Sequence, residues 1–302
     1  TFSMVRLAVS LLAALLLTSP VSASQELVIS IKPLALIARA IAGDHGSIRT
    51  LIPADTSPHH YTLRPSDRLA LESADLIVYV GEELETEFHA VIENLGSDRP
   101  VLALLSVAEL ERRPLASTHS PAGHAGTSRY DPHAWLGPHN GLAIARLIRD
   151  RLVALEPGAA SDFQANYQRF ASTLTEQEQQ WRSMMDSLPG ATYAVYHDGI
   201  GYFEARFNRR HALVLVDDPE VQPGIRHMLQ VRNAIDSLRP VCLFTGSTAR
   251  GNTVDTLLAG RDLRRTELDL LGSRLADGAG YPELLTALVN DYRHCLAGGA
   301  PQ

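Results

Sequence analysis

Residues 159–188 read AASDFQANYQRFASTLTEQEQQWRSMMDSL, a stretch that contains neither glycine nor proline. Its large apolar side chains recur at steps of three, four or seven residues, which places them on one face of an α-helix. These side chains are Phe163, Tyr167, Phe170, Leu174, Trp181 and Met185. With Ser161 as a cap and Pro189-Gly190 as a stop, the sequence predicts one helix of about 28 residues and about 40 Å. We interpret its apolar stripe as a packing surface.

Short apolar runs alternate with longer helical patterns on both sides of this helix. The predicted strands are residues 27–31, 48–52, 76–80 and 101–105 before it, and 193–197, 213–216 and 241–245 after it. Such alternation is typical of parallel sheets with helices on their faces. We therefore predict an α/β fold with two similar lobes, residues 24–158 and 189–302, joined by the long helix 159–188. One rigid helix between the lobes predicts limited hinge motion, because hinges usually lie in loops.

The N-terminal segment has the features of a secretory signal. Arg6 supplies a positive charge, the apolar run Leu7–Leu17 follows, and Val21-Ser22-Ala23 has the small-residue pattern of a cleavage site. The run of about 11 residues is shorter than the roughly 20 that a membrane-spanning helix needs. We expect residues 1–23 to be a signal peptide cleaved near Ala23, and the mature protein to be periplasmic. No cysteine near that site offers a lipid anchor.

Net charge, apolar content and cysteine content narrow the possible classes of protein. The formal net charge of −7 disfavours a nucleic-acid partner, because phosphate binding needs a basic surface. The apolar content of 45% is enough for a full core in a soluble protein. In an exported chain, the two cysteines Cys242 and Cys295 favour a disulfide that joins a strand to the last helix. Two buried thiols are the alternative.

Three histidines occupy separate and well-marked sequence settings: His59 in SPHHY, His133 in DPHAW and His197 in VYHDG. Each lies in a loop after a predicted strand or at the start of a predicted helix. Open α/β sheets bind ligands at the carboxyl ends of their strands, so a cleft between the lobes would bring the three imidazoles together. Converging imidazoles are typical of a first-row metal site. The neighbouring Asp131 and Asp198 can orient these imidazoles or cap helices.

The chain resembles the metal-binding solute-binding proteins of bacterial ABC transporters, in particular their zinc-binding branch. The resemblance extends from about residue 27 to residue 295. It is carried by SPHHYTLRPSD at 57–67, DPHAWL at 131–136, YHDGIGYFE at 196–204 and PEVQPG at 219–224. It implies two α/β lobes joined by one long helix, with a metal ion in the cleft and a disulfide between the two cysteines. The chain departs from the family pattern at Thr245–Ala249, where relatives often carry a Glu-Pro-Gln type sequence.

The resemblance also implies a set of ligands. His59, His133 and His197 match the metal ligands of the family, and a histidine rather than a carboxylate at the third position indicates zinc instead of manganese. Asp269 is the predicted fourth ligand, with water as the alternative. His60 is a further candidate. His119 and His124 lie in the Gly-containing loop 117–129 and are candidates for an accessory metal site. The alternative is that this loop is a plain linker.

The function implied by this resemblance is capture of Zn²⁺ in the periplasm and delivery to the permease of an ABC importer in the inner membrane. A zinc metallochaperone is a further implied partner, and we expect a monomer without enzymatic activity. One alternative is a manganese- or iron-binding member of the same family. Another is a secreted zinc hydrolase, although the sequence has no His-Glu-x-x-His pattern.

Overall fold

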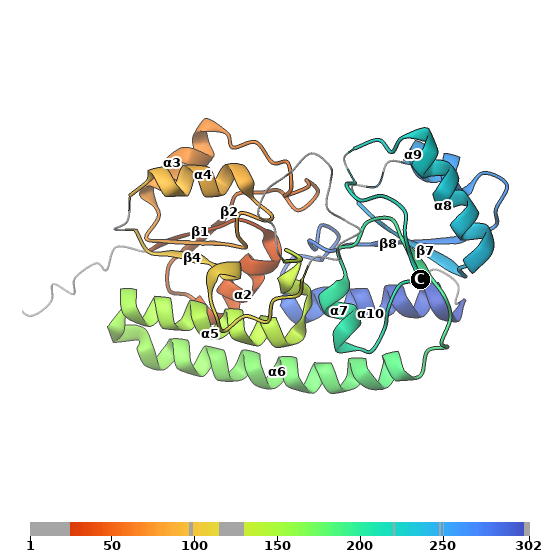
Figure 1. Cartoon of the computed structure of the whole chain (residues 1–302). Coiled ribbons are helices and arrows are strands. Elements are labelled where there is room, and N and C mark those ends of the chain that lie inside the picture. Colours follow the sequence, from red (N-terminus) through yellow and green to blue (C-terminus); the bar gives the residue numbers. More distant parts are fainter. Residues whose placement is uncertain are drawn as a thin grey trace, which may run out of the picture.

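The computed structural model describes residues 25–96, 99–114, 130–219, 221–247, 249 and 251–298. The first lobe contains β1 (Glu26–Ile29), α2 (Lys32–Ala42), β2 (Ser47–Thr50), α3 (Pro65–Ser73), β3 (Leu76–Tyr79), α4 (Thr86–Asn94), β4 (Val101–Ala103) and α5 (Pro138–Leu155). The second contains β5 (Ala194–Val195), α7 (Gly201–Arg206), β6 (Leu213–Val214), α8 (Ile225–Leu238), β7 (Cys242–Gly246), α9 (Gly251–Leu258), β8 (Arg264–Leu268) and α10 (Tyr281–Ala297). The helix α6 (Ala160–Asp186) connects the lobes (Figure 1).

Each lobe is built on a four-stranded sheet whose neighbouring strands pair in parallel. The strand order is β2-β1-β3-β4 in the first sheet and β6-β5-β7-β8 in the second. In the first sheet, Leu27 pairs with Ile48 on one side and with Leu76 on the other. In the second, Ala194 pairs with Leu213 and Leu243 in the same way. The predicted α/β fold of two similar lobes is confirmed.

The long helix predicted for residues 159–188 is confirmed as α6, which has 27 residues. Its apolar stripe is buried along the whole length, from Phe163 to Met185, as expected for packing. The predicted cap is wrong. A 3-10 turn over Pro157–Ala159 precedes the helix, so Ser161 lies within its first turn and makes no side-chain cap.

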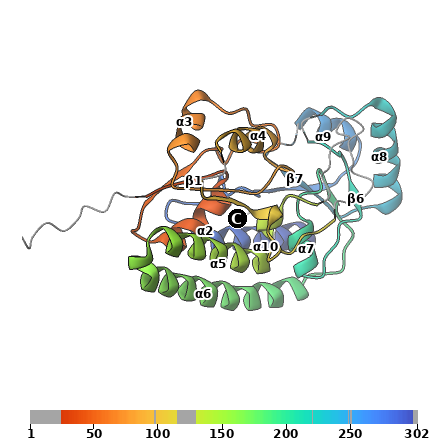
Figure 2. The ribbon, with the colours of Figure 1, turned by 60° about the vertical axis from the view of Figure 1, so that its left-hand side comes forward.

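One hydrophobic core runs through both lobes. It joins residues of β1 and α2 to α5, α6 and α10, while each lobe adds a smaller cluster on the other face of its sheet. Figures 1 and 2 show α6 running along one side of both lobes, with α5 and α10 next to it. The hydroxyl of Tyr281 in α10 donates to the carbonyl of Trp135 at 2.6 Å. The last helix of the chain therefore packs against the first lobe as well as the second.

The disulfide between Cys242 and Cys295 is confirmed. It joins the start of β7 to α10, with a Cα–Cα distance of 5.7 Å, and both residues are fully buried. A cross-link of this kind contributes about 2 to 4 kcal/mol in typical proteins. The bridge fixes the helix that packs against both lobes to the second sheet.

Several strands are shorter than predicted. Residues 101–105 form the three-residue strand β4 and then a 3-10 turn over Leu104–Ser106, and only Ala194–Val195 of the predicted strand 193–197 pairs. Among the described residues, no helix combines the length and apolarity needed to cross a membrane. The predicted signal peptide 1–23 lies outside the described residues.

Candidate metal centre

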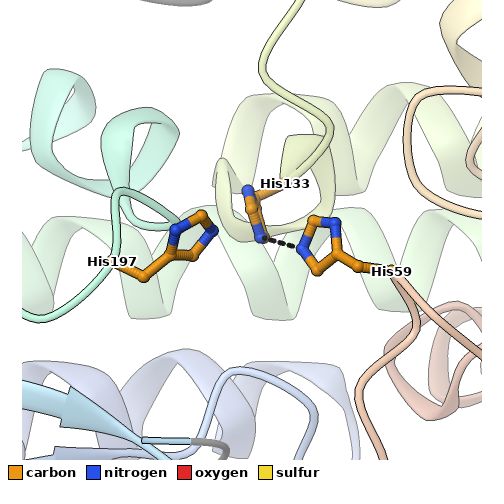
Figure 3. A group of neighbouring side chains, drawn as sticks. All are labelled: His59, His133 and His197. Carbon is orange, nitrogen blue, oxygen red and sulfur yellow. Dashed lines mark hydrogen bonds between the residues drawn. The ribbon is translucent and has the colours of Figure 1, made fainter. Parts of the chain in front are cut away.

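Three histidine side chains point toward one another between the lobes (Figure 3). His59 lies in the loop after β2, His133 in the loop before α5, and His197 in the loop after β5. One nitrogen of each ring lies within 4.8 Å of the other two. The ring centroids are 5.3 to 5.7 Å apart. The structure thus brings together the three histidines that the sequence singled out, two from the first lobe and one from the second.

His133 is the most enclosed of the three, with 4% of its surface exposed. Its Nδ1 lies 2.8 Å from Oδ1 of Asp131, and the same oxygen accepts the backbone N–H of His133 at 2.9 Å. Because a carboxylate only accepts, Nδ1 carries the proton and Nε2 keeps its lone pair for the centre. Of the two roles open to Asp131, the structure supports orienting an imidazole.

His197 is oriented by the main chain instead of a side chain. Its Nδ1 lies 3.1 Å from the carbonyl oxygen of Asp217, in the loop after β6. The carbonyl accepts the Nδ1 proton, so Nε2 faces the centre. This buried Nε2 atom has no hydrogen-bond partner among the described residues. A buried nitrogen without a partner is costly in a protein, and a bound metal ion would satisfy it.

The environment keeps the imidazoles of His59 and His197 neutral. Burial, followed by the nearby His133 and His197, holds the pKa of His59 well below its usual range. Burial, and next to it His133, lowers the pKa of His197 to about 4. Neutral imidazole is the form that binds metal ions. At neutral pH these two ligands have no proton to lose before an ion binds.

The spacing of the nitrogens suits a tetrahedral ion. Zinc–nitrogen bonds of about 2.0 to 2.1 Å in tetrahedral geometry place neighbouring nitrogens about 3.3 to 3.4 Å apart. The Nε2 atoms of His59 and His133 are separated by 3.4 Å. The pairs that include His197 lie within 4.8 Å, so a shift of this ring by no more than about 2 Å would complete three corners.

Gly199 leaves the space that the centre needs. A Cβ atom added there would lie 3.1 Å from Nε2 of His133 and 3.2 Å from Cδ1 of Leu270. A cavity of about 50 Å³ lies beside His197 and is also lined by Thr245, Gly246 and Leu270. One water needs about 10 to 15 Å³ of such volume, so the cavity has room for water next to the ligand. Thr245 and Gly246 belong to the stretch that departs from the family pattern.

Asp269 lies close to the cleft but does not join the three histidines. Its Oδ1 accepts the backbone N–H of Ser273 at 2.8 Å and the hydroxyl at 3.1 Å, and its Oδ2 accepts the N–H of Arg274 at 2.7 Å. The carboxylate, 4% exposed, thereby holds the turn after β8. Asp269 as a ligand stays a prediction.

Of the accessory candidates, only His60 belongs to the described residues. The Nε2 atom of His60 is 3.3 Å from Oδ2 of Asp218, so the pair joins the two lobes at an exposed position. His119 and His124 lie outside the described residues, and Pro114 and Tyr130, which flank that stretch, form an isolated antiparallel bridge. This bridge is next in sequence to Asp131, which orients His133.

Two contributions to the centre were not found from the sequence. The carbonyl of Asp217 acts through the backbone, so its side chain carries no signal. Gly199 acts through space that stays open, and a glycine in a loop is also typical of an ordinary turn. Asp198, the other candidate for orienting an imidazole, lies 3.9 Å from Nε2 of His211.

Comparison with known proteins places this geometry in context. The chain matches the family described as "Zinc-uptake complex component A periplasmic" over residues 27–295. It is 32% identical over 305 residues to the high-affinity zinc uptake system protein ZnuA of Yersinia pestis, with 95% of this chain and 96% of that protein covered. Its fold is similar to a crystal structure of ZnuA, with a TM-score of 0.77, 19% identity, and 91% and 100% of the two chains covered. The periplasmic zinc binding protein TroA from Treponema pallidum gives 0.76 at 22% identity, with coverage of 91% and 99%.

Proposed function

The chain belongs to the family of periplasmic zinc-uptake complex components, and on this basis we propose that it captures one Zn²⁺ ion between its lobes for an ABC-type importer. The observation that carries the proposal is the convergence of three imidazoles from both lobes, with the buried Nε2 of His197 left without a partner among the described residues. Zinc is the cargo of the protein. The donor set suits it, because zinc readily takes imidazole ligands in tetrahedral sites.

We propose that His59, His133 and His197 hold the ion and that water takes the fourth position. The hydrogen bonds of Asp269 to Ser273 and Arg274 favour water, because this carboxylate would have to leave three donors in order to coordinate. A zinc-loaded Asp269→Asn variant that loses as much affinity as a histidine variant would reverse this assignment.

A manganese- or iron-binding role is the second candidate within the family. Manganese prefers oxygen ligands, whereas the three groups that converge here are all nitrogen donors. The family consists of solute-binding proteins, which argues against the hydrolase alternative. The donor set therefore supports zinc over manganese.

The cellular setting follows from the family. We propose that residues 1–23 direct export, with cleavage near Ala23, and that the mature chain works as a monomer. Its partner is the membrane permease of the importer, and a zinc metallochaperone is a further candidate. The family description as periplasmic supports the location.

Metal titration tests the proposal. The purified chain, stripped of metal, is titrated with zinc, manganese and ferrous ions and followed by native mass spectrometry and calorimetry. We expect one tightly bound zinc, weaker manganese and iron, and loss of the site in a double variant, His59→Ala with His133→Ala. Unchanged zinc stoichiometry and affinity in that variant would refute the proposed site.

A further inference from the structure

The two lobes are also joined by hydrogen bonds that involve none of the three histidines. The crossing segment, residues 269–275, follows β8 in the second lobe and makes two hydrogen bonds to the first. Nε1 of Trp135 donates to the carbonyl of Leu270 at 2.9 Å. Nζ of Lys32 donates to the carbonyl of Gly272 at 2.6 Å. Lys32 opens α2, directly after β1, so its long side chain joins the first lobe to the second.

The crossing segment is itself held in one shape. Asp269 binds the backbone N–H groups of Ser273 and Arg274, as described above. Gly272 has φ +74°, a conformation that favours glycine and aims the chain into this tight turn. The turn therefore presents the Gly272 carbonyl at a fixed place. Because the segment is rigid, a hydrogen bond to this carbonyl holds the whole segment and not only the tip of a loop.

The segment also contacts the metal centre. The carbonyl of Leu270 binds Trp135, and its side chain lines the cavity beside His197. The same side chain borders the space above Gly199, next to Nε2 of His133. A displacement of the segment would thus shift the surroundings of ligands from both lobes.

We propose that Lys32 is a positioning residue for zinc: its ammonium group ties the crossing segment to the first lobe and fixes the distance between His197 and the two other ligands. The inference rests on the proposed zinc function. Because the ligands come from two lobes, any freedom between the lobes in the metal-free protein must be lost when zinc binds. A tether that exists before binding removes that cost. Lys32 contributes by preorganisation and does not touch the ion.

The composition of the chain allows the side chain at position 32 to be altered by selective thiol chemistry. Lys32 is the only lysine of the chain, and the only two cysteines are joined in the disulfide. A Lys32→Cys variant therefore carries one free thiol. Alkylation with 2-bromoethylamine forms a carbon–sulfur bond, releases bromide, and restores an amine at nearly the length of the lysine side chain. Alkylation with iodoacetamide gives a neutral control.

Zinc affinity, measured by competition with a chelator, is the main readout. We expect Lys32→Met to weaken zinc binding about tenfold, equivalent to about 1.4 kcal/mol. Arg39→Met removes a charge from an exposed position of the same helix and should stay within twofold. Lys32→Cys should show the same loss as Lys32→Met, and aminoethylation, but not iodoacetamide, should restore affinity.

Hydrogen exchange in the metal-free protein supplies a readout that does not depend on zinc. The amides of Ser273 and Arg274 should exchange faster in Lys32→Met and return to the original rate after aminoethylation of Lys32→Cys. Unchanged zinc affinity in a folded Lys32→Met protein, or equal rescue by iodoacetamide, would overturn the proposal. Absence of zinc binding by the unmodified protein would instead refute the proposed function, so the two failures are distinguishable.

Discussion

The two lobes have the same strand order but orient their candidate metal ligands by different means. In the first lobe, the carboxylate of Asp131 holds His133, and the two residues lie in one short motif. In the second lobe, the backbone carbonyl of Asp217 holds His197 from a loop 20 residues away. The first lobe thus depends on a side chain that one mutation can remove. The second depends on the path of the main chain, which side-chain substitution leaves in place.

Loss of a ligand from the first lobe should have the largest effect. We expect His133→Ala to weaken zinc binding by about 1,000-fold, beyond the 10- to 100-fold typical of residues that only support a ligand. His197→Ala should be similar, because both lobes supply the site. Chelator competition measures the change, with the exposed His139→Ala as a control. If one of the two ligand variants bound zinc normally, the site would belong to a single lobe.

The lobes also differ in how they bury an acid. Glu204 in the second lobe accepts the Tyr193 hydroxyl at 2.6 Å, whereas Glu85 in the first is held by the backbone N–H groups of Val80 and Gly81. Burial is the main cause that raises the pKa of Glu85 from 4.5 to about 7. The folded state therefore keeps this proton in a pH range where the unfolded chain releases it, and stability falls as pH rises.

The burial of Glu85 predicts that the first lobe contributes to the pH dependence of stability. Between pH 4.5 and about 7, ionisation of Glu85 should lower the free energy of unfolding of the metal-free protein by about 3 kcal/mol. Glu85→Gln should remove this contribution, so the free energy of unfolding of the unchanged protein, relative to that of Glu85→Gln, should fall by about 3 kcal/mol over this range. The exposed Glu82→Gln should follow the unchanged protein. Denaturant unfolding at a series of pH values measures both. A difference between the unchanged protein and Glu85→Gln that stays constant with pH would contradict the prediction.

Substitution of the two orienting residues tests the comparison of the lobes itself. Asp131→Asn replaces a carboxylate with a weaker acceptor, and zinc affinity should fall about 10- to 100-fold. Asp217→Asn keeps the backbone carbonyl and should change affinity less than about threefold. Denaturant midpoints of both variants serve as a control for folding. Equal losses in the two variants would contradict the difference between side-chain and main-chain support.

The smallest effect should come from filling the space between the lobes. A methyl group at Gly199 would press on Nε2 of His133, so Gly199→Ala should weaken zinc binding about fivefold to tenfold, a cost of about 1 kcal/mol. Gly190→Ala is the matched control, because an added Cβ there has no neighbour within 4 Å. Competition titrations with the same chelator compare the two. An unaffected Gly199→Ala protein would mean that the ring of His133 can move aside.

The sequence predicted the parts of this molecule that carry a local pattern. The period of apolar residues in α6 was sufficient to predict the linking helix, and the settings of the three histidines were sufficient to predict that these side chains lie together. β8 was missed, because RRTEL in Arg264–Leu268 has exposed charged residues around Thr266 and Leu268 and no apolar run. Its place at the edge of the sheet, paired to β7, is a tertiary effect.

The support of the site was harder to predict than the ligands. The role of Lys32 depends on a carbonyl 240 residues away, and a single lysine near a strand end carries no signal of its own. Asp269 was identified from a family pattern as a ligand, which stays a prediction, but its hydrogen bonds to Ser273 and Arg274 had no sequence signal. Residues that support a site from a distance can be recognised only from the three-dimensional arrangement of both lobes.

A crystal structure of the zinc-loaded protein, recorded at the zinc absorption edge, tests the shared site most directly. We expect one anomalous peak between the lobes, bonded at about 2.0 to 2.1 Å to Nε2 of His59, His133 and His197. A peak bound by histidines of one lobe only, or located outside the cleft, would contradict a zinc site built jointly by the two lobes.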